Sequence, residues 1–364
     1  MKRKIALLLV LCMMLCACGK TETENDTTAA TVPTTTPTTA PVTEPTVPTE
    51  PPETTPPVVL YRHPLNGSAL DAPWSGQAVA VVINNLKQAM PQSGVSQADI
   101  FYEMEVEGDI TRCLAIFSDL SNVEAIGPIR SARTYFNSIA VSYGAPLIHC
   151  GGSPGLALAG RYDDSYDKID NWQHIDSDSK YFYRDYDRYN SGVAWEHTLF
   201  TTGEKLQAAV DAYGYNTPAE EDFGLQFKDG VALEGESANE VTIKFKSGKK
   251  TILSYNSESG KYNVNMHGGE YIDGNTKEAI SFKNVLVLYT KQWYYTDGMH
   301  KIYDTIGSGE GYAAINGKIV PITWTRDTLR THYTYTLADG TPLELDVGNT
   351  YVAMVGIKHD IAYQ

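Results

Sequence analysis

The sequence predicts an α+β fold, in which an N-terminal mixed sheet with helices is followed by a smaller, mainly β domain. Three observations carry this prediction. The run QAVAVVIN at 77–84 is almost continuously apolar, as expected for a buried strand. Apolar side chains recur at helical spacing behind Pro128. Beyond residue 218, short strand patterns alternate with turn residues.

The first 17 residues are typical of a signal peptide. Basic residues at positions 2–4 precede an apolar run that ends at Ala17 and is too short to span a bilayer. The sequence LCAC at 15–18 resembles a bacterial lipobox, in which cleavage precedes the cysteine and Cys18 receives a diacylglycerol. We therefore expect a lipid anchor on the extracytoplasmic face of a Gram-positive-type membrane. The alternative is an ordinary secretory signal with an unrelated cysteine.

Residues 18–57 form a predicted disordered tether. Thr, Pro and Glu alternate there with almost no large apolar side chain, so the segment cannot bury enough surface to fold. Removal of the signal and the tether changes the net charge from −15 to −13. An acidic surface of this kind excludes nucleic acid as the expected partner. The remaining length predicts two domains, at 58–217 and 218–364.

The stretch 100–117 predicts a β-hairpin with a charged face. Gly108-Asp109 is a two-residue turn signal, which would place Arg112 opposite Glu105. The same face would carry three carboxylates, those of Glu103, Glu105 and Glu107. A solvated row of charges with one cross-strand ion pair is the simple interpretation. The alternative is a site for Mg²⁺ or Ca²⁺ beside a phosphate, and no other cofactor is expected.

A helix is predicted to begin at Ser131, a good N-cap that follows Pro128. Arg130 and Arg133 lie at this start, where each positive charge opposes the helix dipole by about 0.3 to 1 kcal/mol. An anion held by the N–H groups of residues 131–133 and by both guanidinium groups would remove the conflict. An internal carboxylate, such as that of Glu103 or Glu105, would remove it equally well.

Further candidate ligands follow a predicted strand at 145–150. Ser153 is expected to cap a short helix whose N–H groups would add donors. Residues 161–200 are rich in Tyr, Asp and Arg without a clear period, which favours a functional loop. It contains Arg184 and Arg188 as further anion ligands. His197 is a candidate for orienting or protonating a ligand oxygen, although a lone histidine is more often structural.

The sequence after residue 200 predicts one helix and many strands. Thr201 with Glu204 predicts a capping box at the start of a helix. Asn316-Gly317 and Asp339-Gly340 predict hairpin turns in the second domain.

Several common sites are excluded by the sequence. GGSPG at 151–155 fits the hydrolase elbow, but Pro154 has no N–H to donate to an oxyanion. DSDSK at 176–180 lacks the third acid and the glycine of a calcium loop. No spacing of Cys and His predicts zinc, and no phosphate-binding GxxxxGK is present.

Two cysteines remain once the signal is removed and Cys18 is lipidated. Cys113 and Cys150 both lie in predicted core strands. A disulfide between them is chemically allowed outside the membrane if their Cα atoms lie within about 7 Å. Two free core thiols are the alternative.

Several motifs in one order resemble the YerB-like lipoproteins of Gram-positive bacteria, a family of unknown function. The motifs are AVVINN, PQSGVSQADIFYEMEVEGDITRCLAIF, IGPIRSAR, HCGGSP and EHTLFTTGEKL, and the likeness extends from about Gly76 to Met354. The resemblance implies a lipid-anchored envelope protein with two domains and no established reaction. Cys113 and Cys150 depart from the family pattern, as does Glu196-His197-Thr198, where Pro-His-Asn is usual.

Three functions are compatible with these residues. The first is a tethered binding module that holds an anionic envelope ligand, such as a phosphorylated glycopolymer or a peptidoglycan fragment, through Arg112, Arg130 and Arg133. The second is a metal-assisted enzyme acting on a phosphate or diphosphate, with the glutamates on the metal and His197 as acid or base. The third is a protein-protein adaptor that uses the β domain. The first is favoured.

Overall fold

The structure is a computed structural model that describes residues 61–108, 110–153, 168–170, 178–216, 222–245, 248–357 and 359–364. Residues Val58–Gln364 form one compact unit. The predicted signal peptide, the predicted lipidation of Cys18 and the predicted tether at 18–57 fall on residues outside the described part of the chain.

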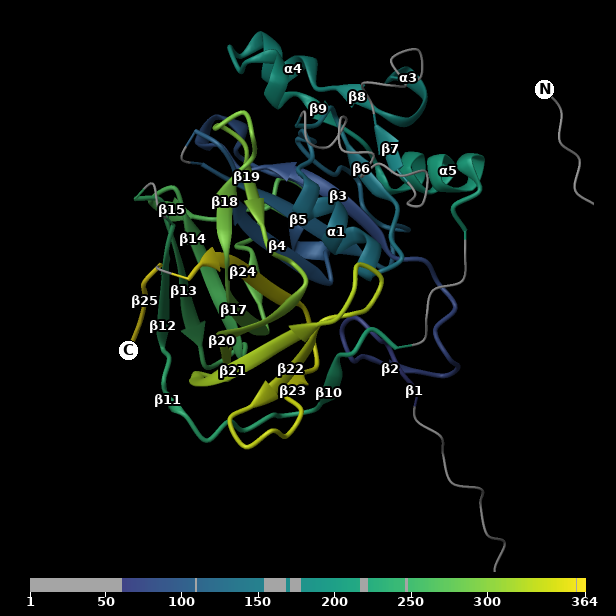
Figure 1. The fold of residues 1–364 in the computed structure, drawn as a ribbon. Helices are drawn as coiled ribbons and strands as arrows, with labels where there is room; N and C mark the ends of the chain where they lie inside the picture. The colour runs from purple at the N-terminus through teal and green to yellow at the C-terminus, as the bar shows by residue number, and fades with distance from the viewer. Residues whose placement is uncertain are drawn as a thin grey trace, which may run out of the picture. The chain divides into compact units, whose positions relative to one another are not determined.

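The largest sheet of the described residues has eleven strands and takes strands from both predicted domains (Figure 1). Its order in space is β11 (Glu236–Ser237), β21 (Lys318–Arg326), β20 (Gly307–Ile315), β17 (Asn284–Thr290), β24 (Thr350–Gly356), β4 (Ile100–Glu105), β5 (Thr111–Phe117), β3 (Val79–Asn84), β6 (Leu147–His149) and β7 (Lys168–Asp170), with β22 (Thr334–Leu337) beside β21. Strand β24 pairs in parallel with both β17 and β4. The two predicted domains therefore share one continuous sheet.

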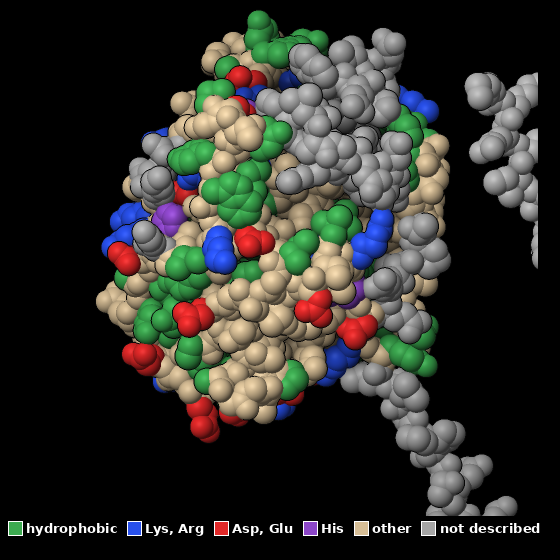
Figure 2. Space-filling view, in the orientation of Figure 1, with side chains coloured by type: hydrophobic (Ala, Val, Ile, Leu, Met, Phe, Trp, Pro, Cys, Tyr) green, Lys and Arg blue, Asp and Glu red, His purple; other side chains and the backbone are tan. Residues whose placement is uncertain are grey.

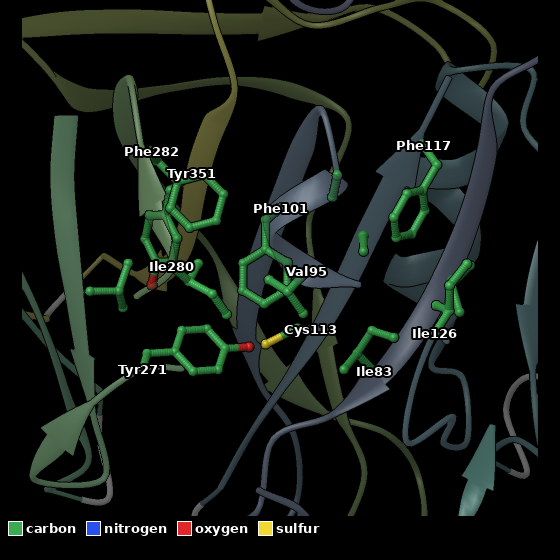
Figure 3. Close-up of a cluster of buried hydrophobic side chains, with 14 of the residues drawn as sticks. Ile83, Val95, Phe101, Cys113, Phe117, Ile126, Tyr271, Ile280, Phe282 and Tyr351 are labelled. Atoms are coloured by element: carbon green, nitrogen blue, oxygen red, sulfur yellow. The ribbon is translucent and has the colours of Figure 1, made fainter. Parts of the chain in front are cut away.

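A second sheet of six strands covers one face of this large sheet. It contains β15 (Gly269–Glu270), β14 (Lys261–Met266), β13 (Lys250–Asn256), β12 (Glu240–Lys244) and β25 (Ile361–Tyr363), with β16 (Ser281–Phe282) beside β14. Figure 3 shows the core between the sheets, where Phe101 of β4 stacks on Phe282 with ring centroids 5.7 Å apart. Strands β3, β4 and β5 are buried along their whole length.

Helix α1 (Thr134–Ser142) packs on the opposite face of the large sheet. Tyr135, Phe136 and Ile139 enter a second core together with Tyr102 and Leu114 of the sheet. The hydroxyl of Tyr135 donates a hydrogen bond to the backbone oxygen of Glu105. The central strands thus lie between two apolar layers, and this explains why they are buried on both faces.

Short elements complete the described chain. Two-stranded pairs are formed by β1 (Tyr61–Arg62) with β2 (Ala69–Leu70), β8 (Tyr183–Arg184) with β9 (Leu199–Phe200), β10 (Gln226–Lys228) with β23 (Glu344–Asp346), and β18 (Gln292–Tyr294) with β19 (Lys301–Tyr303). The remaining helices are α3 (Asp178–Tyr181), α4 (Tyr186–Asn190), α5 (Gly203–Tyr213) and the 3₁₀ helices η1 (Lys87–Ala89), η2 (Val95–Gln97) and η4 (Trp195–His197). Strands outnumber helices clearly, so the α+β prediction is correct only in a broad sense.

The predicted register of the β4–β5 hairpin is wrong by one residue. Glu105 pairs with Thr111 and Met104 pairs with Arg112, because the strands are joined by three residues instead of two. A slip of one residue moves a side chain to the other face of a strand. Arg112 therefore lies on the α1 face, whereas Glu103 and Glu105 point into the core between the two sheets, and the predicted solvated face is buried.

Both predicted helix starts are also displaced. Helix α1 begins at Thr134 with Arg133 at the N-cap position, because Ile129 and Ala132 form bridges to Ile83 and Gly152 that keep the backbone extended. Helix α5 is capped by Thr202, whose side chain accepts the N–H of Lys205. The hydroxyl of Thr201 instead donates to the backbone oxygen of Tyr181.

The predicted turn at Asn316-Gly317 is confirmed. Asn316 has φ 49° and Gly317 has φ 75°, and they join β20 directly to β21. Positive φ at both central positions is the requirement of a type I′ hairpin turn, which explains the Asn-Gly pair.

Glu103 is fully buried and joins the two halves of the chain. We call it, with its hydrogen-bond partners, the Glu103 network; the partners are Asn85, Thr111, Lys249, Thr251 and Tyr351. The Lys249 ammonium lies 2.7 Å from one carboxylate oxygen. Burial alone would raise the pKa of Glu103, but Lys249 and the hydrogen bonds outweigh burial and hold the pKa below its ordinary value.

The substitution Lys249→Met tests this network. It leaves the Glu103 carboxylate buried without a counter-charge, so we expect a loss of about 3 to 5 kcal/mol in the free energy of unfolding. Urea denaturation at pH 7 measures the loss. The matched control is Lys228→Met, which removes an exposed pair with Glu344 and is expected to cost at most about 1 kcal/mol.

The double variant Glu103→Gln with Lys249→Met removes both charges and should recover part of the stability. Because the pKa of Glu103 is lowered in the folded state, the network stabilises the fold above the ordinary glutamate pKa and loses this effect as the pH falls. Equal stability of Lys249→Met and Lys228→Met would contradict the assignment.

Candidate anion-binding site

An extended segment at 129–133 carries two of the predicted arginines. Three backbone hydrogen bonds hold this segment in place. The N–H groups of Ile129, Arg130 and Ala132 donate to the backbone oxygens of Leu199, Val82 and Gly151, respectively. These N–H groups are used inside the fold. Of the three N–H groups at 131–133 that were predicted to hold an anion, that of Ala132 is taken by Gly151, and the helix begins only at Thr134.

Arg112 is buried on the α1 face of β5, at 4% exposure. It lies opposite Asn84 in the register of β3 and β5. One guanidinium nitrogen donates to the backbone oxygen of Ser131 at 2.6 Å, whereas Nε has no partner among the described residues. Burial lowers the pKa of Arg112 to about 10, and Arg130 adds to this, so Arg112 is charged at neutral pH without a carboxylate bound to it.

Arg130 extends toward the surface beside Arg112. Its guanidinium lies 3.2 Å from the carboxylate of Glu196, with 26% of the Arg130 side chain and 50% of the Glu196 side chain exposed. The Nε atom of Arg130 has no partner among the described residues. A half-exposed pair of this kind is weak, because water competes for both charges.

His197 lies next to this pair and is neutral. Asn84 accepts the backbone N–H of Leu86 through its amide oxygen, so its amide nitrogen faces His197 and donates to Nδ1 at 2.7 Å. Nδ1 is thus an acceptor, and the proton of the neutral ring is on Nε2, which lies 3.6 Å from Glu196. Burial lowers the pKa of His197 below 6.5, and Arg130 and Arg188 lower it further against the opposing charge of Glu196.

Together these residues form a site that favours an anion. We call the group Asn84, Arg112, Arg130, Glu196 and His197 the arginine site. Two guanidinium groups and one N–H donor face a single carboxylate, which is half exposed and can be displaced. Arginine offers bidentate, charge-assisted hydrogen bonds to phosphate or carboxylate oxygens.

Arg133 does not belong to this site. Its guanidinium is forked onto Glu107 and also donates to the backbone oxygen of Ala132. Arg133 is 5% exposed, so this pair is largely structural. The alternative that an internal carboxylate pairs with the arginine is therefore correct for Arg133. The carboxylate is that of Glu107, whereas Glu103 or Glu105 was expected.

The side chains of Arg184 and Arg188 donate hydrogen bonds to backbone oxygens of this protein. Arg184 donates to the backbone oxygen of Trp195 and lies over its ring. Arg188 donates to the backbone oxygens of Ala89 and Pro91, at the end of η1. Arg188 lies near enough to His197 to lower its pKa. Its two terminal guanidinium nitrogens are used inside the fold, whereas its Nε has no partner among the described residues.

Ser153 is buried and donates its N–H to the backbone oxygen of Ala132. The residues predicted to form the helix after Ser153 lie outside the described part of the chain. Ser153 therefore lies near the segment that carries the arginines.

The three predicted metal ligands do not converge. Glu103 pairs with Lys249, Glu105 with Lys301 at 2.6 Å, and Glu107 with Arg133. Among the described residues, no group of three or more His, Cys, Asp or Glu could hold a metal ion. The acceptor oxygens that a hard cation would need are engaged by lysine and arginine.

Cys113 and Cys150 are not joined by a disulfide in this structure. Cys113 is fully buried beside Phe101 and Ile83 in the core of Figure 3, and Cys150 packs at its margin. Burial raises the pKa of the Cys113 thiol well above its ordinary value, so it is an inert core side chain. The disulfide that the sequence allowed is absent.

Sequence reasoning missed two members of the arginine site. Asn84 ends the buried strand β3, and a polar residue there was a usable signal. Glu196 gave no signal, because its role depends on the return of η4 to the segment at 129–133.

Comparisons with known proteins agree with this fold. The family model described as "Protein of unknown function (DUF3048) N-terminal domain" matches residues 66–216, and the corresponding C-terminal domain matches residues 241–352. The Bacillus subtilis (strain 168) protein named "Putative lipoprotein YerB" is 27% identical over 281 residues, which cover 76% of this chain and 80% of that protein.

A solved structure is also similar. The crystal structure of the YerB protein from Bacillus subtilis matches with a TM-score of 0.70 and 26% identity, over 83% of this chain and 99% of that chain. The resemblance to YerB-like proteins that the sequence motifs indicated is therefore confirmed. The chain belongs to the DUF3048 family and contains both its N-terminal and its C-terminal domain.

Proposed function

We propose that this protein is a lipid-anchored extracytoplasmic binding module that holds an anionic ligand of the cell envelope in the arginine site. The lipobox at 15–18 and the name of the similar Bacillus subtilis protein support the anchor. Within the described part of the chain, no helix has the length and apolarity needed to cross a membrane. The ligand class is a phosphorylated glycopolymer or a peptidoglycan fragment.

The observation that carries the proposal is the buried charge of Arg112. A buried cation costs several kcal/mol unless an anion or a full set of hydrogen-bond acceptors compensates it. The buried Arg326 has such a set of backbone oxygens, whereas Arg112 donates to one backbone oxygen among the described residues. Arg130 increases the positive potential at this point instead of reducing it. A bound phosphate or carboxylate would accept from both guanidinium groups and from Nε2 of His197.

The state of His197 favours binding over acid-base chemistry. A general base needs a free lone pair near the substrate, but Nδ1 is used by Asn84 and Nε2 carries the proton. The glutamates that a metal-assisted enzyme would use are paired with lysine and arginine. Neither the enzyme nor the protein-protein adaptor is favoured by a specific contact of the described residues.

Two substitutions of opposite effect test the proposed site. Arg130→Gln removes charge-assisted hydrogen bonds worth about 1.5 to 3 kcal/mol, so pyrophosphate should bind about ten- to a hundredfold more weakly. Glu196→Gln removes the competing carboxylate and should strengthen binding by roughly fivefold. Isothermal titration calorimetry of the full chain with pyrophosphate measures both changes.

The matched control is Arg62→Gln. Arg62 pairs with Asp229 and its side chain is 30% exposed, close to the 26% of Arg130. It should leave pyrophosphate binding unchanged. Wild-type protein that binds no pyrophosphate, or equal losses in Arg62→Gln and Arg130→Gln, would refute the proposal.

The protonation of His197 gives an independent test. Its ring should titrate below 6.5 in the wild-type chain. In Asn84→Asp the new carboxylate accepts an Nδ1–H, so we expect the pKa to rise above that value. An NMR pH titration of the ring signals, assigned with His197→Gln, measures both.

The lowered pKa of His197 also predicts how the stability of the fold changes with pH. Because the folded state lowers the pKa of His197, the unfolded state binds more protons as the pH falls through the ordinary histidine range. His197 thus contributes stability above that range and loses it as the pH falls. A wild-type His197 that titrates above 6.5 would contradict the assigned tautomer.

A further inference from the structure

A cluster of exposed aromatic side chains lies directly beside the arginine site. Tyr186, Tyr189 and Trp195 are 61%, 48% and 46% exposed, and both tyrosine rings contact the Trp195 ring. We call these three residues the Trp195 cluster. Figure 2 shows hydrophobic side chains gathered at the top of the molecule, where Figure 1 places α4.

The Trp195 cluster has a fixed geometry. Tyr186 and Tyr189 meet Trp195 edge to face, with ring centroids 6.0 Å and 5.4 Å apart. The Arg184 guanidinium lies 4.6 Å from the centroid of the Trp195 ring and donates to the Trp195 backbone oxygen. Each contact restricts the indole, and close to half of it still faces solvent.

Helix α4, which carries Tyr186 and Tyr189, is also held by hydrogen bonds. Asp185 caps α4 by accepting the N–H of Arg188. The Arg188 side chain then ties α4 to the backbone oxygens of Ala89 and Pro91. A rigid aromatic surface loses little conformational entropy when it binds a ligand.

Continuity in the chain connects this surface to the charged site. Trp195 is followed at once by Glu196 and His197 in the single turn of η4. A ligand whose anionic group lies between Arg130 and His197 therefore has its next chemical unit close to the Trp195 cluster. This position favours one extended ligand over two separate ones.

The exposed rings fit the apolar face of a sugar. A pyranose presents C–H groups on one face, which the negative face of an aromatic ring attracts, and hydroxyl groups around its edge. Asp187 and Arg184 provide polar side chains at the margin of the rings. We propose that the Trp195 cluster binds a sugar ring of the anionic ligand, so that the ligand is a phosphorylated glycan; this inference rests on the proposed function.

A protein partner is less well supported. A stable protein-protein interface buries about 800 Å² on each partner. Three rings around one five-residue helix, bordered by charged side chains, provide a much smaller apolar surface. A single sugar ring matches this size.

The test compares N-acetylglucosamine 1-phosphate with inorganic phosphate, using the full chain and isothermal titration calorimetry. Trp195→Ala should weaken binding of the sugar phosphate by roughly tenfold and leave binding of inorganic phosphate unchanged. Arg130→Gln should weaken both. The matched control is Trp293→Ala, because Trp293 is 49% exposed but lies on strand β18 and belongs neither to the Trp195 cluster nor to the arginine site, and it should change neither.

The outcomes separate the two proposals. If Trp195→Ala binds the sugar phosphate as the wild type does, the glycan inference is refuted and the arginine site stands. If the wild type binds neither phosphate probe, the proposed function fails. In that case the binding of N-acetylglucosamine alone is measured. Binding to the wild type that is lost in Trp195→Ala supports the sugar site, and no binding of N-acetylglucosamine to the wild type refutes it. The inference is also overturned if Trp195→Ala loses binding to a protein partner while its binding of the sugar phosphate is unchanged.

Discussion

The fold depends on one buried carboxylate that ties together segments far apart in the sequence. Glu103 lies on β4, Lys249 and Thr251 come from the second sheet, and Tyr351 comes from β24. The parallel pairing of β24 with β4 places these groups within hydrogen-bond distance. An unpaired carboxylate here would be too costly to bury, so the network specifies how the two halves of the chain combine.

This constraint also fixes the arginine site. Strand β5 pairs with β4 on one side and with β3 on the other, so the register that buries Glu103 places Arg112 opposite Asn84 on the other face. Asn84 then sets the tautomer of His197. Arg112 is therefore held on the central sheet, and Arg130 and His197 are tied to it through hydrogen bonds with Val82 and Asn84 of β3. A site on such a support needs little reorganisation when a ligand arrives.

The sequence predicted those features that depend on local pattern. The apolar runs gave β3 and β6, and the Asn-Gly pair gave the turn between β20 and β21, because periodicity and turn chemistry are local. The hairpin register and the start of α1 were wrong, since the loop length and the bridges of Ile129 and Ala132 depend on tertiary contacts. The partners of the arginines could not be predicted for the same reason.

The contrast between the cations is the strongest physical argument for a ligand. Lys301 and Arg133 are buried and the Lys249 side chain is 11% exposed, and each has its own carboxylate. Arg112 is buried at 4% exposure, yet among the described residues its guanidinium donates to one backbone oxygen, and the positive charge of Arg130 lowers its pKa further. Arg326, at 1% exposure, also has no carboxylate among the described residues, but its guanidinium donates to four backbone oxygens and to the Ser138 hydroxyl. Arg112 has neither a carboxylate nor such a set of acceptors among the described residues, and an anion supplied from outside would provide the missing acceptors.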